Sequence, residues 1–180
     1  MERLYGSFEH SLDPKGRVIL PARLRSCFLA KKEAAVLSRY LDQCLAVWTP
    51  AEFDHQLARA EALEDLGPEE RQMVRALSGF SATLDIDPQW RMTIPATYRQ
   101  YAGLEIGEPI MVVGALNRVE LWRVDRWLER TAPSIESLAN GTSRLFLRQP
   151  LLAGQAPAGQ VQAAPARSGP DDGHTAGGQV

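Results

Sequence analysis

Hydrophobic and polar residues alternate near the N-terminus in the manner of two short strands. Phe8, His10 and Leu12 occupy every second position, and residues 17–20 follow as a second extended run. An alternation with period two predicts strands with one buried face. The segment 13–16 between them reads Asp-Pro-Lys-Gly, which favours a type I turn.

The chain then predicts a short helix and a second pair of strands. Pro21 suits the first helical turn, where its missing N–H leaves no hydrogen bond unmade, so a short helix is expected over residues 22–27. Residues 34–38 and 44–48 have the composition of strands and flank a turn at 40–43. This part of the chain therefore reads as a unit of short strands with one helical turn.

The same unit recurs 74 residues later. Segment 13–25 aligns with 87–99, and six residues of the pair are identical: Asp, Pro, Arg, Pro, Ala and the final Arg. The alignment continues without a gap, with 36–39 on 110–113, 45–48 on 119–122 and Phe53 on Trp127. A register kept over about 40 residues indicates an internal duplication.

Two such repeats predict the fold class. Each unit is too small to bury its own apolar face, so the repeats must close on each other. We therefore expect a mainly β protein with short helices, in which two repeats form one pseudo-twofold barrel. Trp48 and Trp122 stand at matched positions and are expected in the core or at an interface.

Helical patterns follow each repeat. Residues 49–52 form a capping box, after which apolar residues recur at helical spacing. Gly67 and Pro68 end this helix and start another, which gives a helical connector. A final helix is expected to begin at Trp127, with its pattern interrupted by Pro133.

These patterns divide the chain into five segments. We assign residues 5–52 to repeat 1, 53–80 to the connector, 81–126 to repeat 2, 127–152 to a C-terminal helix region and 153–180 to a tail. The tail is rich in Ala, Gly, Pro and Gln and almost lacks large apolar residues. Such a segment cannot recover its ordering entropy by burial, so we expect it to be disordered.

Charge is unevenly distributed along the chain. The formal net charge of −2 gives no overall support for binding to nucleic acid. A nucleic-acid-binding surface would therefore have to appear as a local cluster of basic residues. Acidic residues are concentrated in the connector, whereas the segment 13–25 carries Lys15, Arg17, Arg23 and Arg25 against Asp13 alone. The first turn is therefore the candidate binding surface.

Metal-binding, secreted and membrane proteins are disfavoured. Cys27, Cys44 and the three histidines lack the spacing of a zinc site, and the two thiols are expected to be buried and reduced. The N-terminus has no apolar segment like that of a signal peptide, and no run of about 18 apolar residues could span a membrane. We expect a cytoplasmic protein without a metal.

An enzyme is also disfavoured. The sequence has no G-x-S-x-G motif, no Cys–His constellation and no glycine-rich phosphate loop. Asp13 and Asp87 could meet across the pseudo-twofold axis, but each is followed four residues later by an arginine that would keep it ionised. We predict no catalytic activity, no cofactor and no small-molecule ligand.

The chain resembles the MraZ family of bacterial regulators. Two D-x-x-x-R motifs, Asp13 to Arg17 and Asp87 to Arg91, carry the resemblance, each followed by an I/L-P-A-x-x-R tail. The resemblance implies a double AbrB-like, swapped-hairpin barrel and a ring-like homo-oligomer on the nucleoid. It also implies binding to double-stranded DNA at short direct repeats upstream of the division and cell-wall gene cluster.

The family's D-x-x-x-R turns face DNA, which assigns roles to residues of this chain. The candidate DNA-binding residues are Lys15, Arg17, Arg23, Gln89 and Arg91, and the turn-structuring residues are Asp13, Gly16 and Asp87. An arginine on such a turn can meet phosphate or the major-groove edge of guanine. Arg23 and Arg25 share the short helix, and one of them could instead belong to a solvated or salt-bridged face.

Repeat 2 departs from the family pattern at its turn. Trp90 stands where repeat 1 has Gly16, and a bulky residue would be strained at positive φ. Either the second turn has a different shape, or Trp90 points outward as a contact. Thr97 also replaces Arg23, so repeat 2 is less basic and is expected to contribute less.

The predicted function is a DNA-binding transcriptional regulator, a repressor that occupies its promoter as an oligomer. One barrel offers few phosphate contacts, whereas linked barrels on several boxes would gain roughly 10² to 10⁴ in apparent affinity. The alternative is an antitoxin-like protein-binding module with the same barrel. The shortage of large apolar residues in the tail disfavours that alternative.

Overall fold

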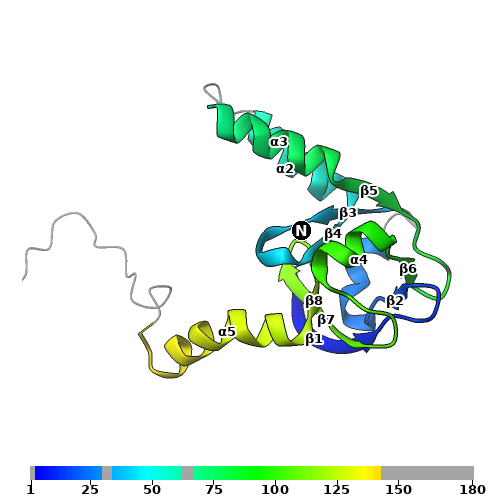
Figure 1. The fold of residues 1–180 in the computed structure, drawn as a ribbon, viewed down its shortest axis with the longest axis vertical. Coiled ribbons are helices and arrows are strands. Elements are labelled where there is room, and N and C mark those ends of the chain that lie inside the picture. Colours follow the sequence, from blue (N-terminus) through cyan, green and yellow to red (C-terminus); the bar gives the residue numbers. More distant parts are fainter. Residues whose placement is uncertain (1–2, 30–33, 62–66, 143–180) are drawn as a thin grey trace, which may run out of the picture.

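The computed structural model describes residues 3–29, 34–61 and 67–142 (Figure 1). The strands are β1 (Leu4–Ser11), β2 (Arg17–Ile19), β3 (Ala35–Arg39), β4 (Leu45–Trp48), β5 (Ser81–Leu84), β6 (Arg91–Thr93), β7 (Pro109–Leu116) and β8 (Val119–Arg123). The helices are η1 (Ala22–Leu24), α1 (Ser26–Leu29), η2 (Leu41–Gln43), α2 (Pro50–Glu61), α3 (Pro68–Gly79), α4 (Ala96–Ala102) and α5 (Val124–Ala139). The prediction of a mainly β protein built from two repeats is confirmed.

The two repeats exchange strands. One antiparallel sheet has the order β1–β7–β8–β4–β3–β5, and β2 pairs with β6 in a separate two-stranded ribbon. Replacing each strand by its counterpart in the other repeat gives the same order read backwards, as pseudo-twofold symmetry requires. β1 thus pairs with a strand of repeat 2, and β5 pairs with a strand of repeat 1.

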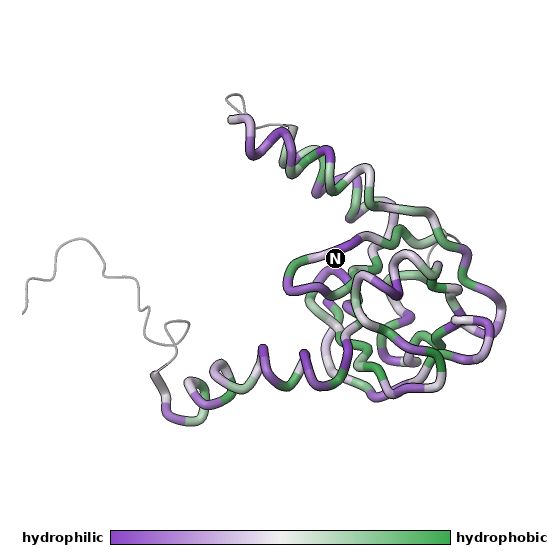
Figure 2. Tube along the Cα trace, viewed as in Figure 1, coloured by the Kyte–Doolittle hydropathy of each residue, from purple (hydrophilic) through white to green (hydrophobic). Residues whose placement is uncertain are grey.

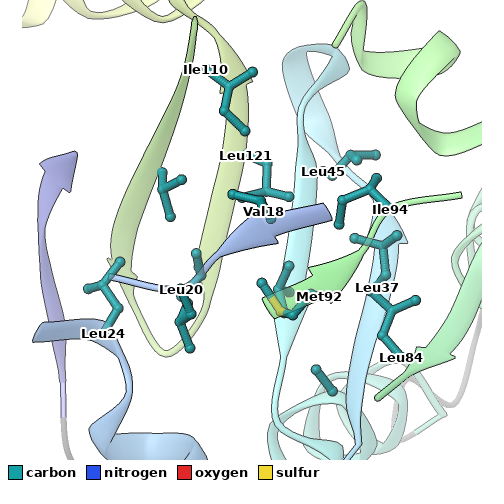
Figure 3. Close-up of a cluster of buried hydrophobic side chains, with 14 of the residues drawn as sticks. Val18, Leu20, Leu24, Leu37, Leu45, Leu84, Met92, Ile94, Ile110 and Leu121 are labelled. Atoms are coloured by element: carbon teal, nitrogen blue, oxygen red, sulfur yellow. The ribbon is translucent and has the colours of Figure 1, made fainter. Parts of the chain in front are cut away.

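The β2–β6 ribbon covers the open side of this sheet. No ladder within the described ranges joins β1 to β5, so the hydrogen-bonded sheet ends at these two strands. Val18 and Met92 pair at the centre of the ribbon and are fully buried in the cluster that contains Leu37 and Leu121 (Figure 3). Packing of the ribbon therefore completes the enclosure of the core.

One strand departs from the gapless alignment of the repeats. In repeat 1 Leu37 pairs with Val47, but in repeat 2 the partner of Leu121 is Val112 and not Met111, which aligns with Leu37. A shift of one residue turns every side chain to the other face of a strand. Val112 accordingly lies in the main core and Met111 packs against a second cluster, so the ungapped alignment of β3 with β7 is wrong by one residue.

The duplication extends into the helices that follow each sheet segment. α5 begins 74 residues after α2, and each helix packs an aromatic ring on the tryptophan of the preceding strand. The ring centroids of Phe53 and Trp48 are 6.5 Å apart, and those of Trp127 and Trp122 are 5.6 Å apart. The final helix therefore begins at Val124, earlier than the expected start at Trp127.

Pro133 does not interrupt α5, contrary to expectation. The helix continues through Pro133 to Ala139. Pro133 and Glu129 are both exposed, so water can reach the Glu129 carbonyl that lacks its helical N–H partner. The predicted disordered tail, residues 153–180, lies outside the described residues.

Both matched tryptophans are buried and have hydrogen-bond partners. Trp48 Nε1 donates to Ser38 Oγ at 2.9 Å, and Trp122 Nε1 donates to Glu120 Oε2 at 3.0 Å. Glu120 is itself buried and forms an ion pair with Arg118 at 2.6 Å. These partners satisfy polar groups that would otherwise destabilise the core.

The two cysteines differ from the expectation that both are buried. Cys44 is buried, and burial raises the pKa of its thiol. Cys27 is only half-buried, because the single turn of α1 lies at the edge of the core.

Gly114 in β7 occupies a position with no room for a side chain. A Cβ there would lie 2.7 Å from Leu24 Cδ2 and 2.7 Å from the backbone nitrogen of Tyr5. Because that backbone belongs to the β1–β7 ladder, it cannot move without loss of pairing. We expect Gly114→Ala to lower the free energy of unfolding by about 1–3 kcal/mol in urea denaturation.

Gly79→Ala is the matched control. Gly79 ends α3 with no atom within 4 Å of its added Cβ, and alanine is favoured over glycine in helices. The control should keep or slightly raise the free energy of unfolding. Equal losses in the two variants would contradict the packing explanation.

Candidate nucleic-acid interface

The β2–β6 ribbon places two arginines on one outward face. Four side chains share this face: Arg17, Ile19, Arg91 and Thr93. Arg17 is opposite Thr93 and Arg91 is opposite Ile19, so the arginines are diagonal neighbours. Such positions are about 7–8 Å apart in an antiparallel pair. The sequence motifs thus converge although they are 74 residues apart.

The carboxylate of Asp13 organises the first turn. Its Oδ1 accepts the backbone N–H groups of Lys15 at 2.9 Å and Arg17 at 3.0 Å. Its Oδ2 accepts a hydrogen bond from Nε of Arg17 at 2.7 Å and lies 2.6 Å from Nη2 of the same side chain. The Gly16 N–H donates to the Asp13 carbonyl at 2.8 Å, which closes the turn. Asp13 therefore fixes both the backbone and the direction of the arginine.

The second turn has the same hydrogen bonds. Asp87 Oδ1 accepts the N–H groups of Gln89 and Arg91, each at 2.9 Å, and Oδ2 accepts Nε of Arg91 at 2.6 Å. The Trp90 N–H donates to the Asp87 carbonyl at 2.8 Å. Arg91 Nη2 also donates to the side-chain oxygen of Gln89 at 3.1 Å, so this guanidinium has one contact that its counterpart lacks.

The hydrogen bonds to both aspartates favour their ionised forms. The Arg17 side chain lowers the pKa of Asp13 to about 2, and the turn N–H groups add to the effect. Partial desolvation raises the pKa of Asp87, but the backbone and side-chain hydrogen bonds from Arg91 outweigh it and the pKa is lowered. Both carboxylates are thus charged at neutral pH and hold their arginines.

Trp90 adopts the same backbone conformation as its counterpart. Its φ is 63° and that of Gly16 is 71°, so the second turn has the shape of the first. The indole does not point out into solvent; it is half-buried against the main core, and the Arg25 guanidinium lies 5.3 Å from the ring centroid. The second turn therefore has neither a different shape nor an outward-pointing tryptophan, so both expectations for Trp90 are wrong. Packing of the indole against the core stabilises the left-handed backbone conformation.

Each turn is bound to the other repeat through its backbone. The Ile94 N–H donates to the Gly16 carbonyl at 2.9 Å, and the Leu20 N–H donates to the Trp90 carbonyl at 2.8 Å. These reciprocal bonds continue the ribbon at both ends. The two turns therefore cannot move independently of each other.

The last arginine of each I/L-P-A-x-x-R tail braces this junction. Arg25 Nε donates to the Leu20 carbonyl at 2.8 Å, and Arg99 Nε donates to the Ile94 carbonyl at 3.1 Å. A Cβ at Gly16 would lie 3.2 Å from Arg99 Nε, which shows how closely this side chain covers the turn. Arg25 is thus the structural member of the Arg23–Arg25 pair, and the role of Arg99 was missed although its identity in both repeats was a signal.

The remaining predicted residues are exposed. Lys15 and Gln89 lie at the tips of the turns, and Arg23 on η1 has no ion-pair partner among the described residues. Turn 1 has one negative and two positive side chains, and turn 2 has one of each. The first turn therefore carries one net positive charge and the second carries none.

The chemistry of this surface suits an anionic partner. Two guanidinium groups are held in place without being buried, with side-chain exposures of 25% for Arg17 and 31% for Arg91. Within the described part of the chain, no three His, Cys, Asp or Glu side chains gather as around a metal ion. In the same ranges, no helix has the length and apolar character needed to cross a bilayer.

The lowered pKa of Asp13 makes stability depend on pH. The unfolded chain takes up this proton near the ordinary pKa of 3.8, whereas the folded chain takes it up near 2. Asp13 therefore stabilises the fold above about pH 4 and loses this effect as the pH falls from about 4 to about 2. Urea denaturation of the wild type and Asp13→Asn should show a difference in midpoint that shrinks over this window.

Asp125→Asn is the control, since Asp125 pairs with Arg123 on an exposed surface outside the ribbon. It should leave the first turn intact, so the circular dichroism spectrum of the free protein should match that of the wild type. A wild-type-minus-Asp13→Asn difference that stays constant from pH 5 to pH 2 would show that the carboxylate charge does not hold the turn.

Comparison with known proteins places these turns in a family. The family described as "MraZ protein, putative antitoxin-like" matches residues 4–76 and 80–149. A "Transcriptional regulator MraZ" of Symbiobacterium thermophilum is 36% identical over 124 residues, which cover 69% of this chain and 86% of that protein. The protein of the same name from Heliobacterium modesticaldum is 35% identical over 137 residues, or 74% and 92% of the two chains.

Among solved structures, the solution structure of PHS018 from Pyrococcus horikoshii has 17% identity and a TM-score of 0.30, covering 67% of this chain and 97% of that one. The curated relatives are transcriptional regulators by name, which agrees with the prediction of a regulator and not an enzyme. Both Asp–Arg turns fall within the matched residues. The chain belongs to the MraZ family of transcriptional regulators.

Proposed function

We propose that this regulator binds double-stranded DNA with the outward face of the β2–β6 ribbon. The observation that carries the proposal is the pair of matched turns, in which Asp13 and Asp87 aim Arg17 and Arg91 from one face. Two-stranded ribbons are among the elements that enter DNA grooves. Neither arginine is needed to fill the core, so their fixed directions serve a partner.

Each kind of side chain on the ribbon has a different role in this proposal. Lys15 at the exposed tip supplies a point charge for phosphate. Asp13 holds Arg17 through Nε and Nη2, and Asp87 holds Arg91 through Nε. Each planar guanidinium can present its remaining N–H groups to guanine O6 and N7 or to a phosphate. Ile19 and Thr93 lie between them and offer apolar contact.

The ribbon is not symmetric in charge, and this gives bound DNA a direction. Lys15 corresponds to Gln89, and Arg23 corresponds to Thr97. The end of the ribbon with turn 1 attracts phosphates more strongly than the end with turn 2. Each subunit should therefore prefer one orientation of a DNA box.

Repression of the division and cell-wall gene cluster follows if several subunits occupy direct repeats in its promoter. One ribbon makes few phosphate contacts, so a homo-oligomer on several boxes gains apparent affinity without any new contact. Such a protein acts in the cytoplasm on the nucleoid. Fluorescence anisotropy with DNA from upstream of its own gene, beside a scrambled sequence and across a salt series, tests this directly.

Selective binding supports the proposal if the logarithm of the binding constant falls linearly with the logarithm of the salt concentration. The slope then gives the number of phosphate contacts, at about −0.9 per contact. Binding without selectivity at any salt concentration contradicts it and favours the antitoxin-like module, for which a protein partner is the next measurement.

Replacing Arg17 should weaken DNA binding through the loss of one directed guanidinium. We expect Arg17→Ala to raise the dissociation constant by about 10- to 100-fold, equivalent to about 1–3 kcal/mol. Arg17→Lys keeps the charge but not the planar fork, so it should recover binding to scrambled DNA more than binding to the specific box. Both are measured by anisotropy at constant salt.

Arg59→Ala is the matched control, because Arg59 is exposed on α2, which projects away from the ribbon (Figure 1). It should bind DNA as the wild type does. An equal loss in Arg59→Ala and Arg17→Ala, or a large fall in melting temperature in Arg17→Ala, would remove the case for a direct contact.

Adding a charge to turn 2 should make the ribbon more nearly symmetric. Gln89→Lys gives turn 2 the tip residue of turn 1, and we expect the salt slope to become steeper by about one contact. It should also reduce the preference for one orientation of the box. An unchanged slope in a salt titration would mean that the tip of turn 2 does not reach the phosphate backbone.

A further inference from the structure

A groove lies between α3, η2 and α5, away from the ribbon. It encloses about 870 Å³, within the range of roughly 300–1,000 Å³ that is typical of small-molecule sites. Its lining residues come from β3, η2, α3, α4 and α5 and from the residues that flank them. No local motif joins residues so far apart in the sequence, which is why motifs alone predicted no small-molecule ligand. We refer to this surface as the arginine groove, after Arg39, Arg126 and Arg130 in its lining.

Arg39 lies at the sheet end of the arginine groove and has no ion-pair partner among the described residues. It belongs to β3, whereas α3 and α5 project away from the sheet (Figure 1). Its guanidinium lies 4.3 Å from the ring centroid of Phe80 and 5.2 Å from that of Tyr101, and its Nε is buried without an acceptor. Buried polar groups in proteins are nearly always hydrogen-bonded, so Arg39 is a group that an anion from outside the chain can satisfy.

Two further arginines line the same groove from α5. Arg126 and Arg130 are four residues apart, so they lie on one side of the helix. Arg126 Nη1 donates to the Gln43 carbonyl at 3.2 Å, and Arg130 Nε lies 3.4 Å from the carboxylate of Asp42. Asp42 is the one acidic side chain in the lining, so three positive charges and one negative charge leave the arginine groove with a net charge of +2.

The segment η2 holds these two arginines through an unusual backbone. Asp42 has a φ of 54° and Gln43 a φ of 57°, so two consecutive residues with side chains are left-handed. A strained conformation persists only where its surroundings determine it, and such residues are concentrated at functional sites. Here the turn brings the Gln43 carbonyl to Arg126 and the Asp42 carboxylate to Arg130. Both guanidinium groups are thereby held in place before a ligand binds, which lowers the entropy cost of binding.

The remaining wall of the arginine groove is apolar and exposed. Leu41, Met73 and Phe80 have exposures of 62%, 66% and 47%. Hydrophobic and hydrophilic residues alternate along α3 (Figure 2), and its apolar residues are the ones that line the groove. A pocket with apolar walls and a few convergent polar groups is the usual form of a small-molecule site.

We propose that the arginine groove binds a nucleotide, with its phosphates on the arginines and its base on the apolar wall. A planar guanidinium binds two phosphate oxygens at once, and a diphosphate can neutralise the net positive charge of the groove. Phe80 has an exposed aromatic ring, on which a base of any kind can stack. A bare anion leaves the apolar wall uncovered, and an uncharged ring leaves Arg39 without an acceptor.

α4 connects the arginine groove with turn 1. Tyr98 and Tyr101 lie on this helix, and their ring centroids are 6.0 and 5.2 Å from the Arg39 guanidinium. Arg99 on the same helix covers Gly16 in turn 1. A nucleotide that draws Arg39 toward its phosphates therefore acts on the helix that braces turn 1, and its negative charge opposes DNA. This link rests on the proposed function: bound nucleotide should weaken DNA binding, and DNA should weaken nucleotide binding by the same factor.

Calorimetric titration of the full chain at constant ionic strength tests the site with three probes. ADP carries both phosphates and a base, pyrophosphate lacks the base, and adenosine lacks the phosphates. We expect saturable binding of ADP with a dissociation constant below about 1 mM, and binding at least about tenfold weaker for each of the other two probes.

A double variant tests whether the arginines of α5 bind the phosphates. Arg126→Gln with Arg130→Gln removes two positive charges outside the core and should weaken ADP binding about 10- to 100-fold. Arg59→Gln with Arg75→Gln makes the same charge change at exposed positions on α2 and α3 outside the groove, and should bind ADP as the wild type does. Arg17→Ala should also keep ADP binding, which distinguishes the arginine groove from the ribbon.

Fluorescence anisotropy with promoter DNA tests the link to turn 1. The ADP concentration is chosen to saturate the wild type and to leave the groove double variant largely unbound, at constant ionic strength. We expect ADP to raise the dissociation constant for DNA about fivefold or more in the wild type. The groove double variant should bind DNA equally well with and without ADP.

Each part of the proposal has a result that overturns it. No saturable binding of ADP, or an equal loss in the groove and control double variants, overturns the site, and a loss in Arg17→Ala places ADP on the ribbon instead. Equal affinities for ADP and pyrophosphate overturn the assignment to nucleotides. ADP binding with an unchanged affinity for DNA overturns the link through α4. Failure to bind DNA with or without ADP counts against the proposed function alone, so the two failures are distinguishable.

Discussion

Two backbone hydrogen bonds exchanged between the repeats determine the geometry of the candidate DNA-binding face. Ile94 donates to the carbonyl of Gly16, and Leu20 donates to that of Trp90. Leaving one buried backbone group unpaired costs roughly 1–3 kcal/mol, so each turn depends on a residue of the other repeat, far away in the sequence. A single repeat has neither the ribbon nor the second half of the sheet, and the site can form only when both repeats have folded together.

The same constraint explains how a tryptophan is tolerated in a turn that requires positive φ. A left-handed conformation costs a residue with a Cβ roughly 1–2 kcal/mol. Trp90 offsets this cost by packing on the core and by receiving Arg25 on its ring. In the first turn the small Gly16 is covered by Arg99 instead. Each turn is thus held by the arginine of the opposite tail, through a ring in one case and through close packing in the other.

The sequence was sufficient for the strands, the duplication and the matched turns because these depend on local pattern and on motifs repeated at one spacing. It was not sufficient for the register of β7, since Met111 and Val112 are both apolar and only their partners decide which of them is buried. Pro133 in α5 was also misjudged, because exposure to water removes much of the penalty for a missing hydrogen bond. The bracing role of Arg25 requires contacts across the repeats that no local pattern contains.

The charge asymmetry within the ribbon bears on the geometry of the complex with DNA in the proposed function. A symmetric dimer presents its two ribbons in opposite senses and suits an inverted repeat, whereas a head-to-tail contact repeats each ribbon in the same sense. Because turn 1 carries a positive charge that turn 2 lacks, the two ends of each ribbon differ and each ribbon has a direction on DNA. If the subunits of an oligomer present their ribbons in the same sense, as the proposed function requires, their basic turns align along boxes that point the same way. Direct repeats are the DNA arrangement that suits such subunits.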